Sequence, residues 1–411
     1  MLGWVFLAFS LTAASFTLNV FFPRRSRALL LPSFFFGWLV GELPLHIGWQ
    51  AACAAGFVAL GALSSPPGAA ALALLVASWV GLLLSIAQSQ RAGSVIEAAL
   101  DRALGKTSSL AISDPVAQRL QSPIGRWRLL WPFHFRHRDV EVIYDIAYAD
   151  VGGPRNHLDV YRPRQRVERA PVLLQIHGGG WIVGNKRQQA LPLLVDLAAR
   201  GFVCVSANYR LSPRATFPDH LIDLKRALIW VRRHIAEHGG DPSFVVVTGG
   251  SAGGHLAALL ALTPNLPEYQ PGNEDVDTRV QGCIPFYGVY DLAGLSSGKP
   301  PDHLVGLWEQ RVLKRKLAAA REAFELASPI GHVHAEAPPF FVIQGSHDSV
   351  VSVEDARAFA AALATASNAP VVYAELPGAQ HAFDLFHSIR THHAIAGIRR
   401  FLTWLIAHRA R

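Results

Sequence analysis

A serine lies at the centre of a glycine-rich turn in GGSAGG, which covers Gly249–Gly254 and contains the pattern G-x-S-x-G. The apolar run Val245–Val247 precedes this turn, and the helix-like run His255–Leu262 follows it. A sharp turn from a strand into a helix strains its central residue and exposes that side chain, provided that glycines relieve the crowding. The pattern therefore predicts that Ser251 is a nucleophile, with an ordinary glycine turn as the alternative.

A serine hydroxyl needs a base at neutral pH, and that base needs an acid to orient it. Asp348 lies shortly after the apolar run FFVIQ, and His381 lies shortly after the next apolar run, VVYAEL. Parallel sheets gather such loops at the carboxyl ends of their strands. We therefore expect Asp348 as the acid and His381 as the base, in the chain order serine, acid, histidine. Other acids and histidines of these segments are alternatives: Glu354, Asp355, Asp384, His347, His387, His392 and His393.

Three consecutive glycines, Gly178, Gly179 and Gly180, follow His177 and an apolar run. A tetrahedral intermediate carries an anionic oxygen that needs preorganised N–H donors, and a glycine backbone can approach the reacting carbon closely. We assign the amides of Gly179, Gly180 and Ala252 as these donors. His177 and Gly178 are expected to brace the loop. The alternative, a phosphate-binding loop, lacks the P-loop Lys-Ser/Thr and the G-x-G-x-x-G spacing.

Residues 139–411 alternate between apolar, β-branched runs and helix-like segments. This alternation predicts an α/β fold with a mostly parallel sheet and helices on both faces. The expected strands are VEVIYDIAYA, LDVYRP, APVLLQIHG, FVCVSANYR, SFVVV, VQGCIPFYG, PPFFVIQGS and PVVYAELPG.

The excess of apolar residues is concentrated in the first 90 residues. Three apolar stretches, Leu2–Phe22, Ala28–Leu63 and Ala69–Ala87, reach the length of a membrane span or exceed it. Glu42 and Pro44 could divide the second stretch into an interfacial piece and a span. A secretory signal is the alternative for the first stretch, but its basic residues follow the apolar run instead of preceding it. We therefore expect a membrane module with three spans, or with four.

Charge is distributed unevenly along the chain. Residues 1–138 carry eleven Lys/Arg and four Asp/Glu, whereas residues 139–411 carry 27 and 26. This asymmetry favours attraction to anionic lipid headgroups, and no motif of a nucleic-acid-binding protein is present. We expect three spans in an inner or plasma membrane, because three spans place both basic clusters, and the catalytic domain with them, on the cytoplasmic side. Four spans would export the catalytic domain. The clusters are Arg24, Arg25 and Arg27, and then Arg91, Arg102, Lys106, Arg119, Arg126 and Arg128.

We predict three parts: a transmembrane helical module in residues 1–90, a basic and aromatic linker or cap in residues 91–138, and a catalytic domain in residues 139–411. Gly125–Arg138 mixes arginine with Trp and Phe, which is typical either of the membrane–water boundary or of a packed strap. Leu292–Ala337, which contains the basic, helix-like EQRVLKRKLAAAREAF, is a second segment that could cover the site.

The motifs HGGGW, GGSAGG, GSHD and GAQHAFD, in this order, resemble the hormone-sensitive-lipase-like branch of the α/β-hydrolase superfamily over about residues 140–411. NYRLSP resembles this branch too. The resemblance implies an α/β-hydrolase fold and ester hydrolysis through an acyl-enzyme, without a metal or an organic cofactor. Ser251, Asp348 and His381 match its catalytic residues, and His177, Gly178, Gly179 and Gly180 match its oxyanion motif.

The sequence also departs from this branch. Gly250 stands where many members carry an acidic residue before the serine. The membrane module is not a general feature of the branch, although membrane-bound relatives that cleave prenylcysteine methyl esters have comparable spans. The motifs are also similar to those of arylformamidases and some deacetylases.

We therefore expect a membrane-anchored serine carboxylesterase or lipase that acts on a small-molecule or lipid ester and contacts membrane lipids. The alternatives are an amide or formamide hydrolase or a deacetylase with the same catalytic residues, and a non-catalytic membrane ligand sensor. Cys53, Cys204 and Cys283 lie far apart in apolar surroundings, which predicts buried thiols and argues against a zinc site or disulfides. The sequence leaves the oligomeric state and the preferred chain length open.

Overall fold

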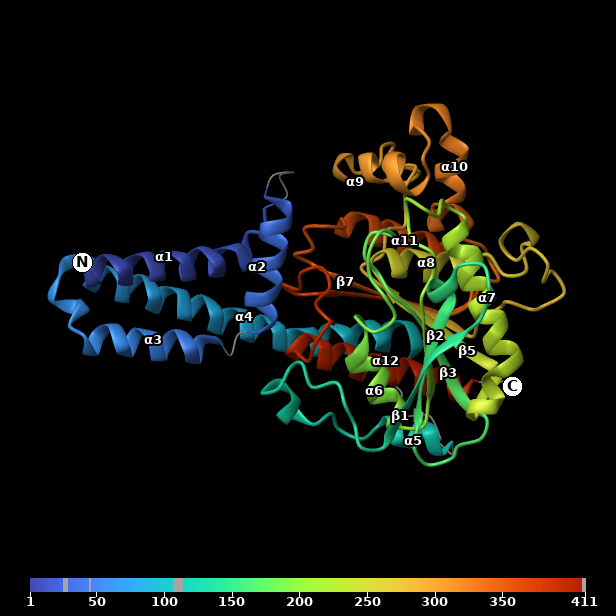
Figure 1. Cartoon of the computed structure of the whole chain (residues 1–411), viewed down its shortest axis with the longest axis horizontal. Helices are drawn as coiled ribbons and strands as arrows, with labels where there is room; N and C mark the ends of the chain where they lie inside the picture. Colours follow the sequence, from blue (N-terminus) through green and yellow to red (C-terminus); the bar gives the residue numbers. More distant parts are fainter. Residues whose placement is uncertain (25–28, 44–45, 106–113, 409–411) are drawn as a thin grey trace.

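The computed structural model describes residues 1–24, 29–43, 46–105 and 114–408. It consists of an arm of apolar helices and an α/β part built on one sheet (Figure 1). The predicted basic residues Arg25, Arg27 and Lys106, and the predicted break at Pro44, lie outside the described residues.

The α/β part contains eight strands in the order β1-β2-β4-β3-β5-β6-β7-β8. Strands β1 and β2 are antiparallel to their neighbours, and the strands from β4 through β8 pair in parallel. The predicted α/β class and all eight expected strands are thereby confirmed. The strands are β1 (Val140–Ala147), β2 (His157–Pro163), β3 (Ala170–Ile176), β4 (Val203–Ala207), β5 (Gly240–Gly250), β6 (Gly282–Phe286), β7 (Phe340–Gly345) and β8 (Val371–Leu376).

Helices cover both faces of the sheet, because the central strands are apolar on both sides. Alternate residues of β3 belong to two separate cores: Leu174 packs in one and Leu173 in the other. The first core includes residues of α7 (Asp219–His234), α8 (Ala252–Leu262) and α11 (Val353–Ala366). The second includes residues of α6 (Leu191–Ala198), α12 (Ile389–Ala407) and the end of α4.

The arm is made of α1 (Leu2–Phe21), α3 (Ile47–Ala59) and the first part of α4 (Pro66–Leu104), and α2 (Leu30–Glu42) stands across its base (Figure 1). Helices α1 and α4 are long and apolar enough to cross a membrane, and the bent pair of α2 and α3 could be a third span. At 1.5 Å per residue, α1 is about 30 Å long and α3 about 20 Å.

Helix α4 runs through the predicted boundary at residue 90 without a break. Its 39 residues extend over about 60 Å, and its last turns bury Ile96 and Leu100 in the core under the sheet. Residues 91–104 are therefore helical and packed on the α/β part. The arm and the α/β part are joined by one continuous helix, α4.

Two other expectations differ from the structure. EQRVLKRKLAAAREAF does not form one helix: a π-helical turn at Trp308–Val312, a 3-10 turn at Leu317–Ala319 and the short helix α10 (Arg321–Leu326) take its place. Cys204 and Cys283 are buried as expected, but Cys53 is exposed. The prediction of a third buried thiol was therefore wrong, since Cys53 lies on the outer side of α3.

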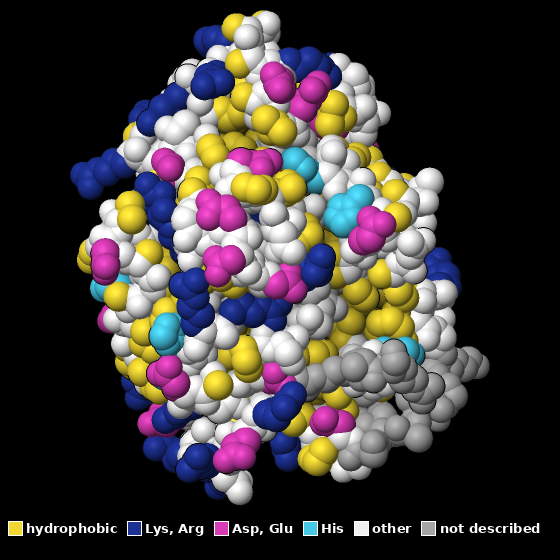
Figure 2. All heavy atoms as spheres, turned by 90° about the vertical axis from the view of Figure 1, so that its right-hand side faces the viewer, with side chains coloured by type: hydrophobic (Ala, Val, Ile, Leu, Met, Phe, Trp, Pro, Cys, Tyr) yellow, Lys and Arg dark blue, Asp and Glu magenta, His cyan; other side chains and the backbone are white. Residues whose placement is uncertain are grey.

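The two ends of the molecule have different surfaces. The arm exposes large apolar side chains such as Trp4, Leu11, Leu18, Leu83 and Leu84. The end away from the arm carries Lys, Arg, Asp and Glu interspersed over its face, with apolar side chains between them (Figure 2). Mixed charges of both signs are usual for a surface that faces water.

Candidate active site

Ser251 occupies the turn between β5 and α8. Its backbone is in the left-handed half of conformational space, with φ 58° and ψ −123°. Such a conformation strains a residue that has a side chain, so the surroundings must fix it. The Ser251 amide donates to the Phe286 carbonyl at 3.0 Å, and the His255 amide donates to the Ser251 carbonyl at 3.0 Å. The turn predicted around Ser251 is therefore present.

The glycines of this turn are required by close packing. A side-chain carbon at Gly249 or Gly253 would come closer than 3.0 Å to backbone atoms. A side-chain carbon at Gly250 would come equally close to the ring of Tyr287. This contact explains why glycine stands where the resembled branch often has an acid.

His381 joins Ser251 to Asp348. The two atoms His381 Nε2 and Ser251 Oγ are 2.9 Å apart, and His381 Nδ1 and Asp348 Oδ2 are 2.8 Å apart. Asp348 lies in the loop after β7 and His381 in the loop after β8, at the same edge of the sheet as Ser251. The structure thus brings together the three side chains that the sequence predicts as nucleophile, base and acid.

Asp348 is held from its other side by backbone amides. The amides of Val350 and Val351 both donate to Asp348 Oδ1 at 2.8 Å, and Gln344 Nε2 donates to Oδ2 at 3.1 Å. The carboxylate is buried. An acid fixed in this way can hold the imidazole with Nδ1 protonated, which leaves Nε2 free to accept the serine proton.

Gln380, which the sequence analysis missed, ties the two loops together. Its side-chain oxygen accepts hydrogen bonds from the amides of Ser349 and His381, at 2.7 Å and 2.8 Å. The acid loop and the histidine loop are therefore cross-linked next to the reacting groups. The signal in the sequence is slight, because a glutamine directly before a histidine has no chemistry of its own.

Tyr287 was also missed. It follows β6, its ring lies 4.6 Å from that of His381, and its hydroxyl donates to Asp384. Burial raises the pKa of Asp384 to about 6. Asp384, an alternative acid in the sequence, is therefore bonded to tyrosine, and the acid at hydrogen-bonding distance from the imidazole of His381 is Asp348.

The remaining alternatives lie elsewhere. Asp355 accepts from the Tyr290 amide at 2.8 Å in the first turn of α11. His347 Nδ1 donates to the Val20 carbonyl at 3.0 Å. The other histidines contact neighbours around α12: His387 and His392 hydrogen bond each other, and His393 contacts Gln90.

The glycine loop passes beside the serine. A side-chain carbon at Gly178 would lie 3.1 Å from Ser251 Cβ, and Gly179 and Gly180 have positive φ values of 111° and 60°. Among the described residues, the amides of Gly179, Gly180 and Ala252 have no hydrogen-bond acceptor. The Gly178 amide, in contrast, donates to Gln189 Oε1 at 2.6 Å. The three unpaired amides could serve as donors to an oxyanion.

His177 lies below this loop. Its Nδ1 donates to the Gly178 carbonyl at 2.8 Å, and its own carbonyl accepts from the Tyr209 hydroxyl at 2.9 Å. Its ring stacks on Tyr209 with 4.4 Å between the ring centres. Burial lowers the pKa of His177 to about 4, so its imidazole is neutral at pH 7 and acts as a brace.

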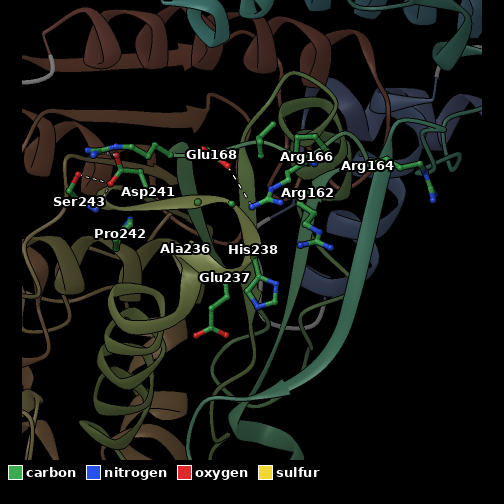
Figure 3. A pocket seen from close by; sticks show the side chains of 15 residues that line it. Arg162, Arg164, Arg166, Glu168, Ala236, Glu237, His238, Asp241, Pro242 and Ser243 are labelled. Atoms are coloured by element: carbon green, nitrogen blue, oxygen red, sulfur yellow. Dashed lines mark hydrogen bonds and ion pairs between the residues drawn. The ribbon is translucent and has the colours of Figure 1, made fainter.

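Two further observations concern a possible metal site and a second pocket. No cluster of three or more potential metal ligands occurs in the described parts of the chain. A surface pocket of about 670 Å³ lies at the opposite edge of the sheet, beside the starts of β3 and β5 (Figure 3). Two ion pairs lie in its lining, between Arg166 and Glu168 and between Arg169 and Asp241. The pocket is remote from Ser251, because it lies at the start of β5 and Ser251 follows the end of that strand.

Comparisons with known proteins agree with this architecture. A family model described as BD-FAE matches residues 158–363. A relative from Mycobacterium tuberculosis, named probable carboxylic ester hydrolase LipM, is 44% identical over 407 residues, covering 97% of this chain and 92% of its own. The resemblance to the hormone-sensitive-lipase-like branch is not tested by these matches and stays a prediction.

Solved structures of an esterase from Thermogutta terrifontis, Est2, are similar to the α/β part. The butyrate-bound form has a TM-score of 0.52 at 28% identity and covers 64% of this chain and 92% of its own. The form phosphonylated by sarin has a TM-score of 0.50 at 29% identity and covers 61% and 87%.

Proposed function

This chain belongs to the BD-FAE family and is a hydrolase of carboxylic esters; from this premise we propose that it is a membrane-anchored serine carboxylesterase that cleaves lipidic esters through an acyl-enzyme on Ser251. The observation that carries the proposal is the continuous hydrogen-bonded chain from Ser251 through His381 to Asp348, beside three amides that have no acceptor among the described residues. A nucleophile, an oriented base and oxyanion donors are what acyl transfer requires.

The reaction follows from the positions of these groups. His381 Nε2 takes the proton of Ser251 as the serine oxygen attacks the ester carbonyl carbon. The amides of Gly179, Gly180 and Ala252 stabilise the oxyanion, and His381 then protonates the leaving alcohol. A water molecule, deprotonated by His381, releases the acid and restores the serine. The loss of one oxyanion donor typically lowers the rate by about 10²–10³-fold.

The similarity to Est2 supports a serine mechanism. That protein is described as phosphonylated by sarin, and organophosphonates react with activated nucleophiles. Est2 is also described with butyrate bound, which makes short acyl chains the alternative to lipidic ones.

Membrane anchoring rests on the arm. Helices α1 and α4 have the length and apolarity of spans, and their exposed apolar side chains would be unfavourable in water. Both helices run from the tip of the arm toward the α/β part (Figure 1). Their basic flanks, Arg24, Arg91 and Arg102, therefore follow the spans on the catalytic side, which favours a cytoplasmic catalytic domain.

The proposal is tested with the full-length protein in detergent. We expect a fluorophosphonate to label wild type and not Ser251→Ala, and Ser251→Ala to lose hydrolysis of p-nitrophenyl esters by about 10⁴-fold or more. The same preparations are assayed on arylamides and formamides. Turnover of amides alone would exclude the ester function, and a wild type that neither labels nor turns over any substrate would favour a ligand sensor.

A further inference from the structure

Helix α2 of the N-terminal arm lies against the histidine loop of the candidate site. The rings of Phe34 and His381 contact edge to face, with 6.0 Å between their centres. A side-chain carbon at Gly37, one turn further along, would lie 3.5 Å from Gln380 Nε2. Trp38 packs on Phe386 at 5.2 Å. One face of α2 therefore borders the loop that carries the predicted base.

Polar contacts fix α2 in this place. Glu42 at its end accepts hydrogen bonds from Arg390 Nη1 at 2.7 Å and from Ser388 Oγ at 2.8 Å, and Glu42 and Arg390 are both buried. Near the end of α1, the Val20 carbonyl accepts from His347, the residue next to Asp348. The arm is thus attached on both sides of His381, and the position of Phe34 is set by the fold.

The orientation of α2 places it at the membrane surface if α1 and α4 are spans. It stands across the base of the arm (Figure 1), and its axis makes an angle of 92° with that of α3. Between Leu30 and Gly41 it carries no charged residue. Leu31 and Phe35 are 64% and 49% exposed, so this helix presents apolar side chains next to the catalytic loops.

A second apolar surface adjoins α2. Phe386, which contacts Trp38, also packs on Phe133 at 5.2 Å. Phe133 and its neighbour Trp131 are 61% and 68% exposed. Exposed aromatic side chains from two distant parts of the sequence therefore meet beside the histidine loop, an arrangement that suits the interface between lipid and water.

We propose that Phe34 is a specificity-determining residue and that α2 forms the wall along which an ester reaches Ser251 from the bilayer. The alkyl part of the substrate packs against the ring of Phe34, while its carbonyl enters between Ser251 and the glycine amides. The substrate class is an ester with a long, uncharged alkyl chain that dissolves in the membrane. This inference rests on the proposed esterase function and deepens it by naming the route and the selecting residue.

The test compares Phe34→Ala with Phe36→Ala in the full-length protein in detergent. Phe36 is a matched control, since it lies on the same helix but stacks on Phe16 of α1, with 4.0 Å between the ring centres. The substrates are p-nitrophenyl acetate, butyrate, octanoate and laurate. We expect Phe34→Ala to lower the ratio of kcat/KM for laurate to that for acetate by about tenfold, because lost apolar contacts with a substrate cost on this order. Phe36→Ala should keep the ratio within about twofold of wild type.

A second measurement does not depend on the folding of an alanine variant. A benzophenone-bearing phenylalanine analogue replaces Phe34 or Phe36, and Ser251 is then modified with dodecyl fluorophosphonate and irradiated. We expect a cross-link between the dodecyl chain and position 34, with little or none from position 36.

The outcomes separate the two proposals. If wild type hydrolyses the esters but Phe34→Ala keeps the chain-length ratio of wild type, or position 34 gives no cross-link, the inference about α2 is wrong and the esterase function stands. If wild type hydrolyses none of the four esters, the proposed function itself fails.

Discussion

At the scale of single residues, the site depends on which partner each polar group already has. Asp348 accepts hydrogen bonds from two backbone amides on Oδ1, and its Oδ2 contacts His381 and Gln344. Asp384, only three residues after His381, is bonded to Tyr287. Two buried carboxylates near one imidazole therefore have separate roles.

This difference predicts unequal effects of removing the two charges. Asp348→Asn should lower kcat by on the order of 10⁴-fold, because the asparagine favours the wrong tautomer of His381. Asp384→Asn should have a much smaller effect, below about tenfold, since the amide oxygen of the new side chain can still accept from Tyr287. Initial rates with one p-nitrophenyl ester measure both, and equal losses would contradict the assignment of Asp348 as the acid.

The lowered pKa of His177 predicts that the stability of the fold depends on pH. Its pKa is about 4 in the folded chain and about 6.5 in an unfolded chain. Below pH 6.5 the unfolded state therefore binds a proton that the folded state does not, and the free energy of unfolding falls until pH 4 is reached. His177→Gln should remove this part of the fall. Thermal unfolding at pH 7.5 and pH 4.5 should show a smaller decrease of Tm in the variant than in wild type.

At the scale of elements, local patterns predicted much of the structure, and tertiary contacts determined the rest. Apolar β-branched runs and the loops after them located all eight strands and the serine, histidine and acid loops, because these signals are confined to a few residues. The break in residues 309–324 and the continuity of α4 through residue 90 depend on what each segment packs against. The same holds for Gln380 and Tyr287, whose positions follow from the fold around His381.

The position of α2 was not predicted either, since no periodicity relates Phe34 to a histidine far along the chain. The sequence did indicate that Glu42 and Pro44 could divide the second apolar stretch. Helix α2 does end at Glu42, while Pro44 lies outside the described residues. The sequence analysis did not predict a buried partner for Glu42, and the structure pairs this residue with Arg390.

Variants of the buried pair Glu42–Arg390 test how α2 is held against the α/β part. Arg390→Met leaves Glu42 buried without its cation and should lower the free energy of unfolding by about 3–5 kcal/mol. The double variant Glu42→Gln with Arg390→Met should recover part of this loss. Thermal unfolding of the two single variants and the double variant in one detergent measures the coupling. If the double variant is less stable by the sum of the two single losses, the pair does not act as a unit.

At the scale of the whole molecule, the proposed topology predicts which side of the membrane the catalytic domain occupies. Three crossings, with basic residues following the first and last, would place residues 139–411 in the cytoplasm. In intact cells the catalytic domain should resist an added protease, and it should be digested after the membrane is opened. A reporter fused after Gln90 should give the same answer, and digestion in intact cells would exclude this orientation.

The continuity of helix α4 has a further consequence. One unbroken helix runs from the tip of the arm into the core under the sheet. If the arm spans the membrane as proposed, this helix would hold the serine at a fixed height and tilt relative to the bilayer. The enzyme would then sample a two-dimensional film of substrate, and its turnover would follow the number of ester molecules per unit of membrane area. Diluting the ester with inert lipid at constant total substrate should slow such an enzyme, whereas adding buffer should not.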